Sequence, residues 1–136
     1  MLKYLAAYLA TVIVFVGIDL IWLGYIGRGF YRDRLGGLLL DQPNLAAAFM
    51  FYALYGVGVI VFAVQPAFQS GSWMTALLFG ALFGFFAYAT YDLTNLATLK
   101  GWPLSLTLVD LAWGSVLTGI SATLGYLIVA RLLRLA

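Results

Sequence analysis

Long apolar runs dominate the chain, and its polar residues gather between them. Each of four runs is long enough to cross the hydrocarbon core of a bilayer as a helix, which takes about 20 apolar residues. They cover residues 2–27, 45–64, 73–97 and 104–130. The connections at residues 66–72 and 98–103 are short, so the helices that they join are expected to be antiparallel neighbours. The pattern predicts an all-α protein, an integral membrane four-helix bundle with up-down-up-down topology and a single transmembrane domain over residues 1–136.

Residues at the ends of these runs are typical of helix boundaries. Asn44, which follows Pro43, can cap the second helix, and Ser72 can cap the third. Pro103 suits the first turn of the fourth helix. Pro66 comes just after the second run, and we expect that helix to end before it.

The connection between the first two runs, residues 28–44, is more polar than the others. Here arginines alternate with aromatic residues and leucine, as in Arg28, Phe30, Tyr31, Arg32, Arg34 and Leu35. This alternation indicates a segment that lies in the membrane interface, with aromatic rings dipping inward and arginines facing lipid head groups. An ordinary positively charged flank of a helix has the same composition and remains an alternative.

Composition narrows both the class of protein and its chemistry. The chain is 65% hydrophobic and only 9% charged, which is typical of a membrane protein. It contains no Cys, His or Glu, which excludes thiolate nucleophiles, Ser-His-Asp triads and zinc or di-iron sites built from those residues. The net charge of +2 is too small to suggest nucleic acid, and the basic residues flank the runs. We therefore expect membrane lipids, and no nucleic acid, as partners.

The distribution of basic residues gives only a weak indication of the membrane orientation. Lys3, Arg131 and Arg134 lie on the side of the two termini, and four basic residues lie on the other side. We favour termini in the cytoplasm because Lys3 flanks the first helix to insert.

Small residues recur at four-residue spacing in the last two runs. The third run contains Gly80 and Gly84, and the fourth contains Ser115 and Gly119. Such spacing lets two helix backbones approach closely in lipid. It predicts that the third and fourth helices form the tightest pair, and it is also compatible with a homo-oligomer or a partner membrane subunit.

Three aspartates interrupt the apolar runs, namely Asp19, Asp92 and Asp110. A carboxylate within a bilayer costs at least a few kcal/mol unless it is paired, hydrated or protonated. With a rise of 1.5 Å per residue, all three lie roughly 8–12 Å below the same membrane face. We therefore expect a one-sided polar pocket beneath the arginine-rich connection.

Residues near that level complete the candidate site. The three aspartates are the candidate catalytic groups, as general acids or bases. They are also the candidate ligands should the cofactor be a divalent cation such as Mg²⁺. The expected ligand-binding residues are polar or aromatic, and the two arginines among them can bind a phosphate. They are Asn95, Tyr88, Tyr91, Trp22, Trp113, Tyr52, Thr94, Arg28 and Arg32.

Four functions remain open. The position of the three aspartates beneath the arginine-rich connection favours a protein that binds or modifies a lipid or another membrane-dissolved amphiphile. A proton- or cation-coupled small transporter is less well supported, because residues 5–15 and 57–64 offer few polar groups for a path to the other face. The aspartates could instead form a structural hydrogen-bond network. The small size also suits an accessory or structural subunit of a membrane complex.

Several motifs resemble those of one known family. The run FAYATYDLTN at residues 86–95, with KGWP at 100–103, resembles the signature of domain-of-unknown-function family 2177, a bacterial family of four-helix predicted membrane proteins. Residues 19–24, 30–31 and 110–114 are similar to its other motifs. The resemblance covers nearly the whole chain. It implies a four-helix membrane fold and a multi-pass location in the bacterial cytoplasmic (inner) membrane, and it implies no established activity.

Overall fold

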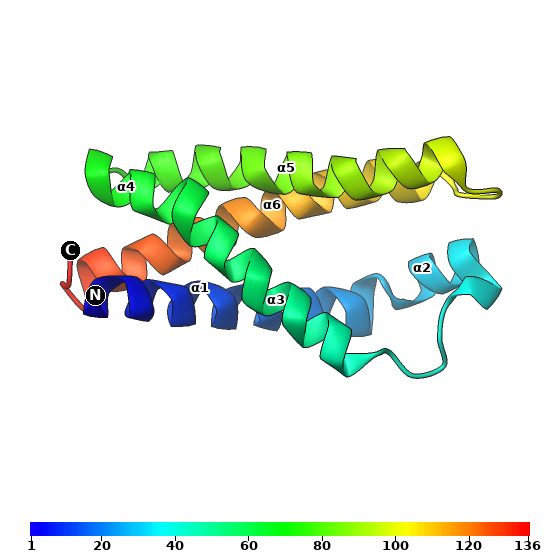
Figure 1. The fold of residues 1–136 in the computed structure, drawn as a ribbon, viewed down its shortest axis with the longest axis horizontal. Coiled ribbons are helices and arrows are strands. Elements are labelled where there is room, and N and C mark those ends of the chain that lie inside the picture. The colour runs from blue at the N-terminus through cyan, green and yellow to red at the C-terminus, as the bar shows by residue number, and fades with distance from the viewer.

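Four long apolar helices make up the protein, as predicted. The computed structural model describes the backbone of residues 1–136 and every side chain except that of residue 26. Its helices are long and apolar enough to cross a membrane over Leu2–Tyr25, Leu45–Ser70, Trp73–Thr98 and Leu104–Leu132. Both termini lie at the same end of the bundle (Figure 1), as an up-down-up-down order requires.

Short turns of π- and 3-10 helix interrupt or extend the spans. The first span consists of α1 (Leu2–Ile21) and the π-turn η1 (Trp22–Ile26), and the second of α3 (Leu45–Val59), the π-turn η3 (Ile60–Val64) and α4 (Gln65–Ser70). The connection between them contains α2 (Arg28–Leu35) and the 3-10 turn η2 (Gly36–Leu38). The third span is α5 (Trp73–Thr98), and the fourth is α6 (Leu104–Leu127) with the π-turn η4 (Ile128–Leu132).

Two of the predicted helix caps are confirmed. The Asn44 side chain accepts a hydrogen bond from the Ala47 amide at the start of α3. The Ser72 hydroxyl accepts one from the Met74 amide at the start of α5.

The second helix runs further than predicted. We expected it to end before Pro66, but it continues through α4 and ends at Gly71, where a positive φ of 70° forms a left-handed cap. Proline normally breaks a helix because it lacks an N–H and collides with the preceding turn. Here Pro66 falls in the first turn of α4, directly after the π-turn η3, where a missing N–H is tolerated.

The third and fourth spans form the closest pair, which confirms the prediction from their small residues. α5 and α6 are in contact along most of their length. A Cβ added to Gly80 would lie 2.9 Å from the Thr118 carbonyl oxygen, and one added to Gly84 would overlap the Gly114 carbonyl. The two backbones therefore approach too closely to admit any side chain at these glycines.

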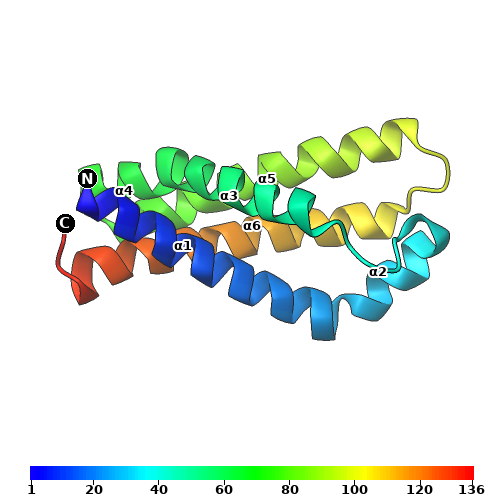
Figure 2. The ribbon, with the colours of Figure 1, turned by 60° about the horizontal axis from the view of Figure 1, so that its bottom comes forward.

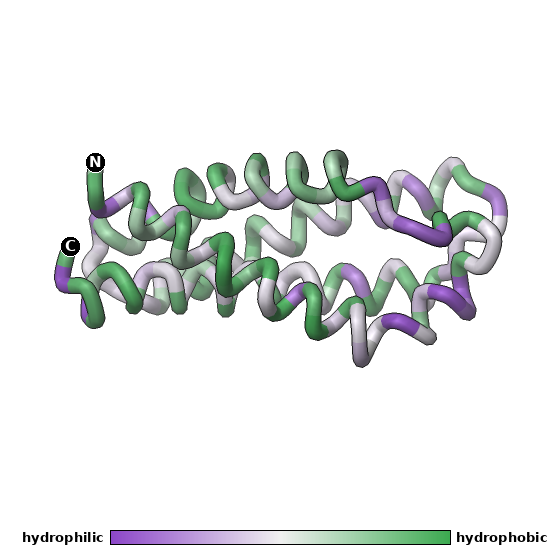
Figure 3. Tube along the Cα trace, turned by 90° about the horizontal axis from the view of Figure 1, so that it is seen from below, coloured by the Kyte–Doolittle hydropathy of each residue, from purple (hydrophilic) through white to green (hydrophobic). Residues whose placement is uncertain are grey.

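α3 takes a diagonal path through the bundle. Its continuation η3 packs against α5, whereas α3 itself crosses toward α1 (Figures 1 and 2). As a result α3 and α5 separate toward the end of the bundle that lies opposite the termini. Polar residues also concentrate at this end (Figure 3). The divergence of α3 and α5 thus occurs at the membrane face where the aspartates were expected.

Candidate functional site

One face of α2 covers a polar pocket. Arg28, Tyr31, Arg32 and Leu35 are spaced i, i+3, i+4 and i+7, which brings them to one side of a helix. All four line a pocket of about 540 Å³, a volume within the range of small-molecule sites. The other lining residues come from the first span, from the segment that leads into α3, from α5 and from α6. They are Asp19, Trp22, Leu23, Leu39, Leu40, Asp41, Pro43, Tyr88, Asp110 and Trp113.

Polar contacts dock α2 against α6. The Tyr31 hydroxyl donates to Oδ1 of Asp110 at 2.5 Å and accepts from Nε1 of Trp22 at 3.1 Å. Nε of Arg34 donates to the Ser105 hydroxyl at 2.8 Å. Burial, reinforced by the hydrogen bond to Asp110, raises the pKa of Tyr31, so that its phenol stays protonated and keeps donating.

Gly27 makes this docking possible. It is buried between η1 and α2, and an added Cβ would lie 2.8 Å from the ring of Tyr31 and 3.0 Å from Nε1 of Trp22. Only glycine therefore lets α2 turn back closely enough for Tyr31 to reach the pocket.

Asp19 is held by donors from two other spans. The Tyr52 hydroxyl of α3 donates to its Oδ2 at 2.7 Å, and Nε1 of Trp113 in α6 lies 3.4 Å from its Oδ1. The indole rings of Trp22 and Trp113 stack beside it, with centroids 4.3 Å apart and planes 15° apart. Both donors to Asp19 are neutral, so they fix the carboxyl group without supplying a counter-charge.

Asp92 and Asp110 are neighbours across the α5–α6 interface. Their carboxyl groups are close enough for the ionisation of one to affect that of the other. Asp110 is 8% exposed and lines the polar pocket, whereas Asp92 is 0% exposed. Neither oxygen of Asp92 has a hydrogen-bond partner in the described part of the protein. A buried polar group is nearly always hydrogen-bonded, so this bare carboxyl group marks the pair as an unusual site.

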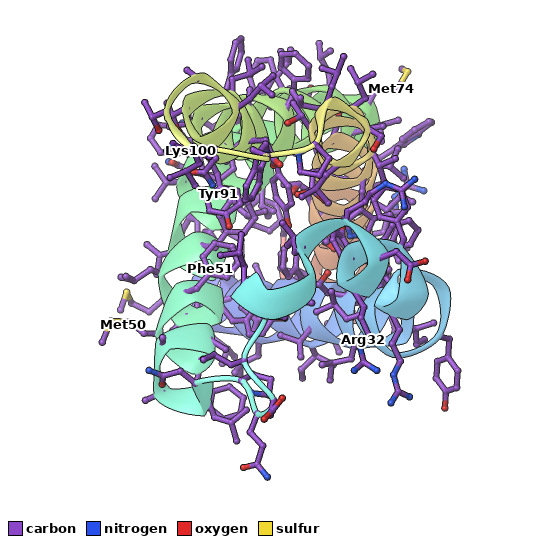
Figure 4. All side chains as sticks on the ribbon, turned by 90° about the vertical axis from the view of Figure 1, so that its right-hand side faces the viewer. Arg32, Met50, Phe51, Met74, Tyr91 and Lys100 are labelled. Carbon is purple, nitrogen blue, oxygen red and sulfur yellow. The ribbon has the colours of Figure 1, made fainter. Side chains whose placement is uncertain are left out.

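A second, mainly apolar pocket lies where α3 and α5 diverge. It has a volume of about 390 Å³ and is lined by Phe51, Tyr55, Ala87, Tyr88, Tyr91 and Asp110. In the view along the bundle, Phe51 and Tyr91 lie beside the central opening, while Met50 points outward (Figure 4). Tyr88 and Asp110 also line the polar pocket, so the two pockets meet at these two side chains.

Four predicted site residues line neither pocket: Asp92, which lies behind Asp110, Tyr52, which bonds to Asp19, and also Thr94 and Asn95. Thr94 is exposed, and its hydroxyl bonds back to the carbonyls of Thr90 and Tyr91. It follows Asp92 by two residues, which is about 200° around a helix and therefore on the far side. Asn95 is half-buried and does not bond to Asp92, whose oxygens have no partner among the described residues.

The three aspartates do not form one cation site. Among the described residues, no group of three carboxylate, imidazole or thiolate side chains could hold a metal ion together. Asp19 accepts hydrogen bonds from Tyr52 and Trp113, whereas Asp110 accepts one from Tyr31. The hypothesis of a divalent cation bound by all three is therefore not supported by this geometry.

The structure brings together most of the other predicted residues and adds several. Asp19, Trp22, Arg28, Arg32, Tyr88, Asp110 and Trp113 line the polar pocket, Tyr91 lines the apolar one, and Tyr52 bonds to Asp19. The sequence reasoning missed Tyr31 as a site residue, although its i+3 spacing from Arg28 was a usable signal. It also missed the apolar lining residues Phe51 and Ala87, which carry no distinctive pattern.

Comparisons with known proteins agree with this membrane architecture. The pattern of the family described as "Predicted membrane protein (DUF2177)" matches residues 4–127. No curated protein and no solved structure is significantly similar to the chain.

Proposed function

The chain belongs to the predicted membrane protein family DUF2177, and from its two joined pockets we propose that it binds a membrane-dissolved amphiphile. The head group occupies the polar pocket beneath α2, and the hydrocarbon tail occupies the apolar pocket between α3 and α5. The protein acts in the bacterial inner membrane.

The junction of the two pockets at Tyr88 and Asp110 carries this proposal. On one side of the junction the lining includes the charged groups of Arg28, Arg32 and Asp19. On the other side it is aromatic and apolar apart from tyrosine hydroxyls and Asp110 itself. An amphiphile has the same order of polar and apolar parts, and ligand sites are typically apolar with a few polar groups that fix orientation.

The position of the apolar pocket also suits entry from the bilayer. It lies within the membrane-spanning part of the chain, at the level where α3 and α5 have separated. A tail can therefore enter sideways between these helices while its head group stays near the interface. Asp110 then lies at the boundary of head and tail, where a carboxyl group could act as a general acid or base on the bound molecule.

One observation favours a proton- or cation-coupled transporter as a second candidate. Beyond Asp92, the buried hydroxyls of Thr11 and Ser121 also lack partners among the side chains that the structure describes, and Tyr55 bonds to the buried Thr118. These groups extend the polar interior past the aspartates, and intramembrane acids are frequent in proton relays. Flux in liposomes driven by a pH or cation gradient, and lost in Asp92→Asn, would support this candidate over simple binding.

Native mass spectrometry of the protein extracted in mild detergent tests the binding proposal. We expect the wild type to retain a stoichiometric amphiphile. Ala87→Trp, which fills the apolar pocket, should lose it, whereas Leu82→Trp on the exposed face of the same helix should keep it. A wild type that carries no ligand, or equal retention by both variants, would contradict the proposal. A bound protein chain would instead favour an accessory-subunit role.

A further inference from the structure

We infer that the bound amphiphile is a long-chain amine, a cation whose ammonium group is attached directly to its hydrocarbon tail. The ammonium binds in the inner part of the polar pocket, beside Asp110, and the tail extends into the apolar pocket. This inference rests on the proposed function and specifies the chemistry of the same site.

The inner part of the polar pocket offers a head group acceptors rather than donors. Asp19 and Asp110 line it, and each is only 8% exposed. The side chains that donate to them are neutral, since Tyr52 and Trp113 donate to Asp19 and Tyr31 donates to Asp110. An ionised carboxyl group in such surroundings is stabilised by a cation. The interior therefore favours a cationic head group.

The aromatic lining also suits a cation. Trp22 and Trp113 both line the pocket and stack on each other. Their N–H groups bond within the protein, one to Tyr31 and the other to Asp19, so the indoles have no donor left for an anionic head group. What aromatic rings then offer a ligand is the negative face of their π system, which attracts cations. Tyr88 adds a further ring at the junction of the pockets.

The charges at the mouth of the pocket do not reverse this preference. Arg28 and Arg32 lie there together with Asp41, and all three are exposed. Asp41 offsets one of the two guanidinium charges, and exposed charges are screened by water and salt. With Asp41 included, the lining contains three carboxyl groups and two guanidinium groups, so its excess charge is negative. The arginines instead suit the membrane interface, where they face lipid head groups.

The order of the two pockets places the cation next to the tail. Because Tyr88 and Asp110 line both pockets, a tail in the apolar pocket ends beside Asp110. Asp92 lies behind Asp110, fully buried, and adds no positive charge from that side. A phosphate attached to the tail would bring an anion to this carboxyl group. An ammonium attached there brings three N–H donors, which can bond to Asp110 and the Tyr88 hydroxyl.

Four amphiphiles that share a dodecyl chain test the inference on the purified wild type. Dodecylammonium carries its cation next to the tail, and dodecanol has the same length without the charge. Dodecyl phosphoethanolamine carries the same ammonium beyond a phosphate, and dodecanoate carries an anion. Dodecylammonium is mixed in equal amounts with each of the others, one member of each pair being deuterated, and is added to the protein in a neutral ethylene-oxide detergent. Native mass spectrometry then counts the bound copies of each.

We expect one copy of dodecylammonium per chain, bound about tenfold more tightly than any of the other three, as for one charge-assisted hydrogen bond. Equal binding of dodecylammonium and dodecanol would overturn the cationic ligand and leave amphiphile binding intact. Equal or tighter binding of dodecyl phosphoethanolamine or dodecanoate would overturn the position of the cation next to the tail. No saturable binding of any of the four would contradict the proposed function itself.

Variants then locate the charge that binds the ammonium. Asp110→Asn should bind dodecylammonium and dodecanol equally. Asp41→Asn removes the same charge at the exposed mouth and should lower the preference less, because exposed charges are screened. Asp33→Asn is the matched control, since Asp33 is exposed and lines neither pocket, and it should keep the full preference.

Two results with the variants would overturn the ammonium site beside Asp110. One is a folded Asp110→Asn that keeps the wild-type preference for dodecylammonium. The other is a loss of preference in Asp41→Asn or Asp33→Asn as large as that in Asp110→Asn. If Asp110→Asn does not fold, the wild-type panel decides the inference.

Discussion

Asp92 on α5 lies fully buried behind Asp110 on α6, and the two carboxyl groups have unequal surroundings. Asp110 accepts a hydrogen bond from Tyr31 and faces both pockets, whereas neither Asp92 oxygen has a partner in the described part of the protein. A fully buried acid without a partner costs more to ionise than one that accepts a hydrogen bond. We therefore infer that Asp92 holds the proton of the pair and that Asp110, which faces both pockets, carries the charge.

Replacing each acid by its amide should separate these roles. Asp92→Asn substitutes a neutral group for a neutral group, so the thermal midpoint and lipid binding should remain close to wild type. Asp110→Asn removes a charged group at the junction of the two pockets and should weaken amphiphile binding by about tenfold, the loss expected for one charge-assisted hydrogen bond. Thermal unfolding with and without lipid measures both effects. If Asp92→Asn were the more damaging variant for binding, the assignment of the charge to Asp110 would be wrong.

Gly114 should be essential to the shape of the site. A Cβ at this position would overlap the ring of Tyr88, which lines both pockets. Gly114→Ala should cost about 1–3 kcal/mol through overpacking and should weaken lipid binding. Gly17→Ala is the control, because nothing lies within 4 Å of its added Cβ. It should stabilise α1 by about 0.5 kcal/mol and leave lipid binding unchanged; equal effects of the two substitutions on binding would contradict this picture.

Tyr31 should make the docking of α2 sensitive to alkaline pH. The pKa of Tyr31 is raised above its usual value near 10 in the folded protein. Its contribution to stability is therefore complete below pH 10. As pH rises further, the unfolded chain releases this proton while the folded protein retains it, so the contribution falls by up to about 1.4 kcal/mol per pH unit. The difference in unfolding free energy between wild type and Tyr31→Phe should accordingly shrink above pH 10, and a difference independent of pH would argue against the buried phenol.

Thr94 and Asn95 provide a negative test of the site. Thr94 is exposed and neither residue lines a pocket. Thr94→Val and Asn95→Ala should therefore leave lipid affinity within about twofold of wild type, since substitutions away from a site usually change stability by less than 0.5 kcal/mol. Tyr52→Phe, which removes a donor to Asp19, should cost about 1–3 kcal/mol of stability by leaving a buried acceptor unpaired. Loss of binding in Thr94→Val would show that the ligand lies elsewhere.

Much of the fold could be predicted because membrane spans are determined by the local amino-acid composition. A span needs a long apolar run, and close helix packing needs small residues at fixed spacing. Both signals correctly identified the four helices and the α5–α6 pair. The extension past Pro66 could not be predicted, because it depends on the π-turn η3 before it, and a π-turn has no clear sequence signature.

The candidate site was only partly predictable for a different reason. The common membrane depth of Asp19, Asp92 and Asp110 could be predicted, because depth along a helix follows from counting residues. Side-chain direction between helices does not follow from counting, so the position of Asn95 outside both pockets could not be predicted. The contribution of Phe51 to the apolar pocket depends on the diagonal path of α3, which is a property of the assembled bundle.

Photocrosslinking with a long-chain amphiphile that carries a diazirine near the middle of its hydrocarbon chain tests the central claim most directly. Peptide mass spectrometry of the irradiated protein should locate the adducts on Phe51, Tyr55, Ala87 and Tyr91, the lining of the apolar pocket. Excess of the same amphiphile without the diazirine should displace them. Adducts spread over outward-facing residues such as Met50 and Leu78, undiminished by competitor, would show that the amphiphile merely coats the bundle and would contradict binding in the joined pockets.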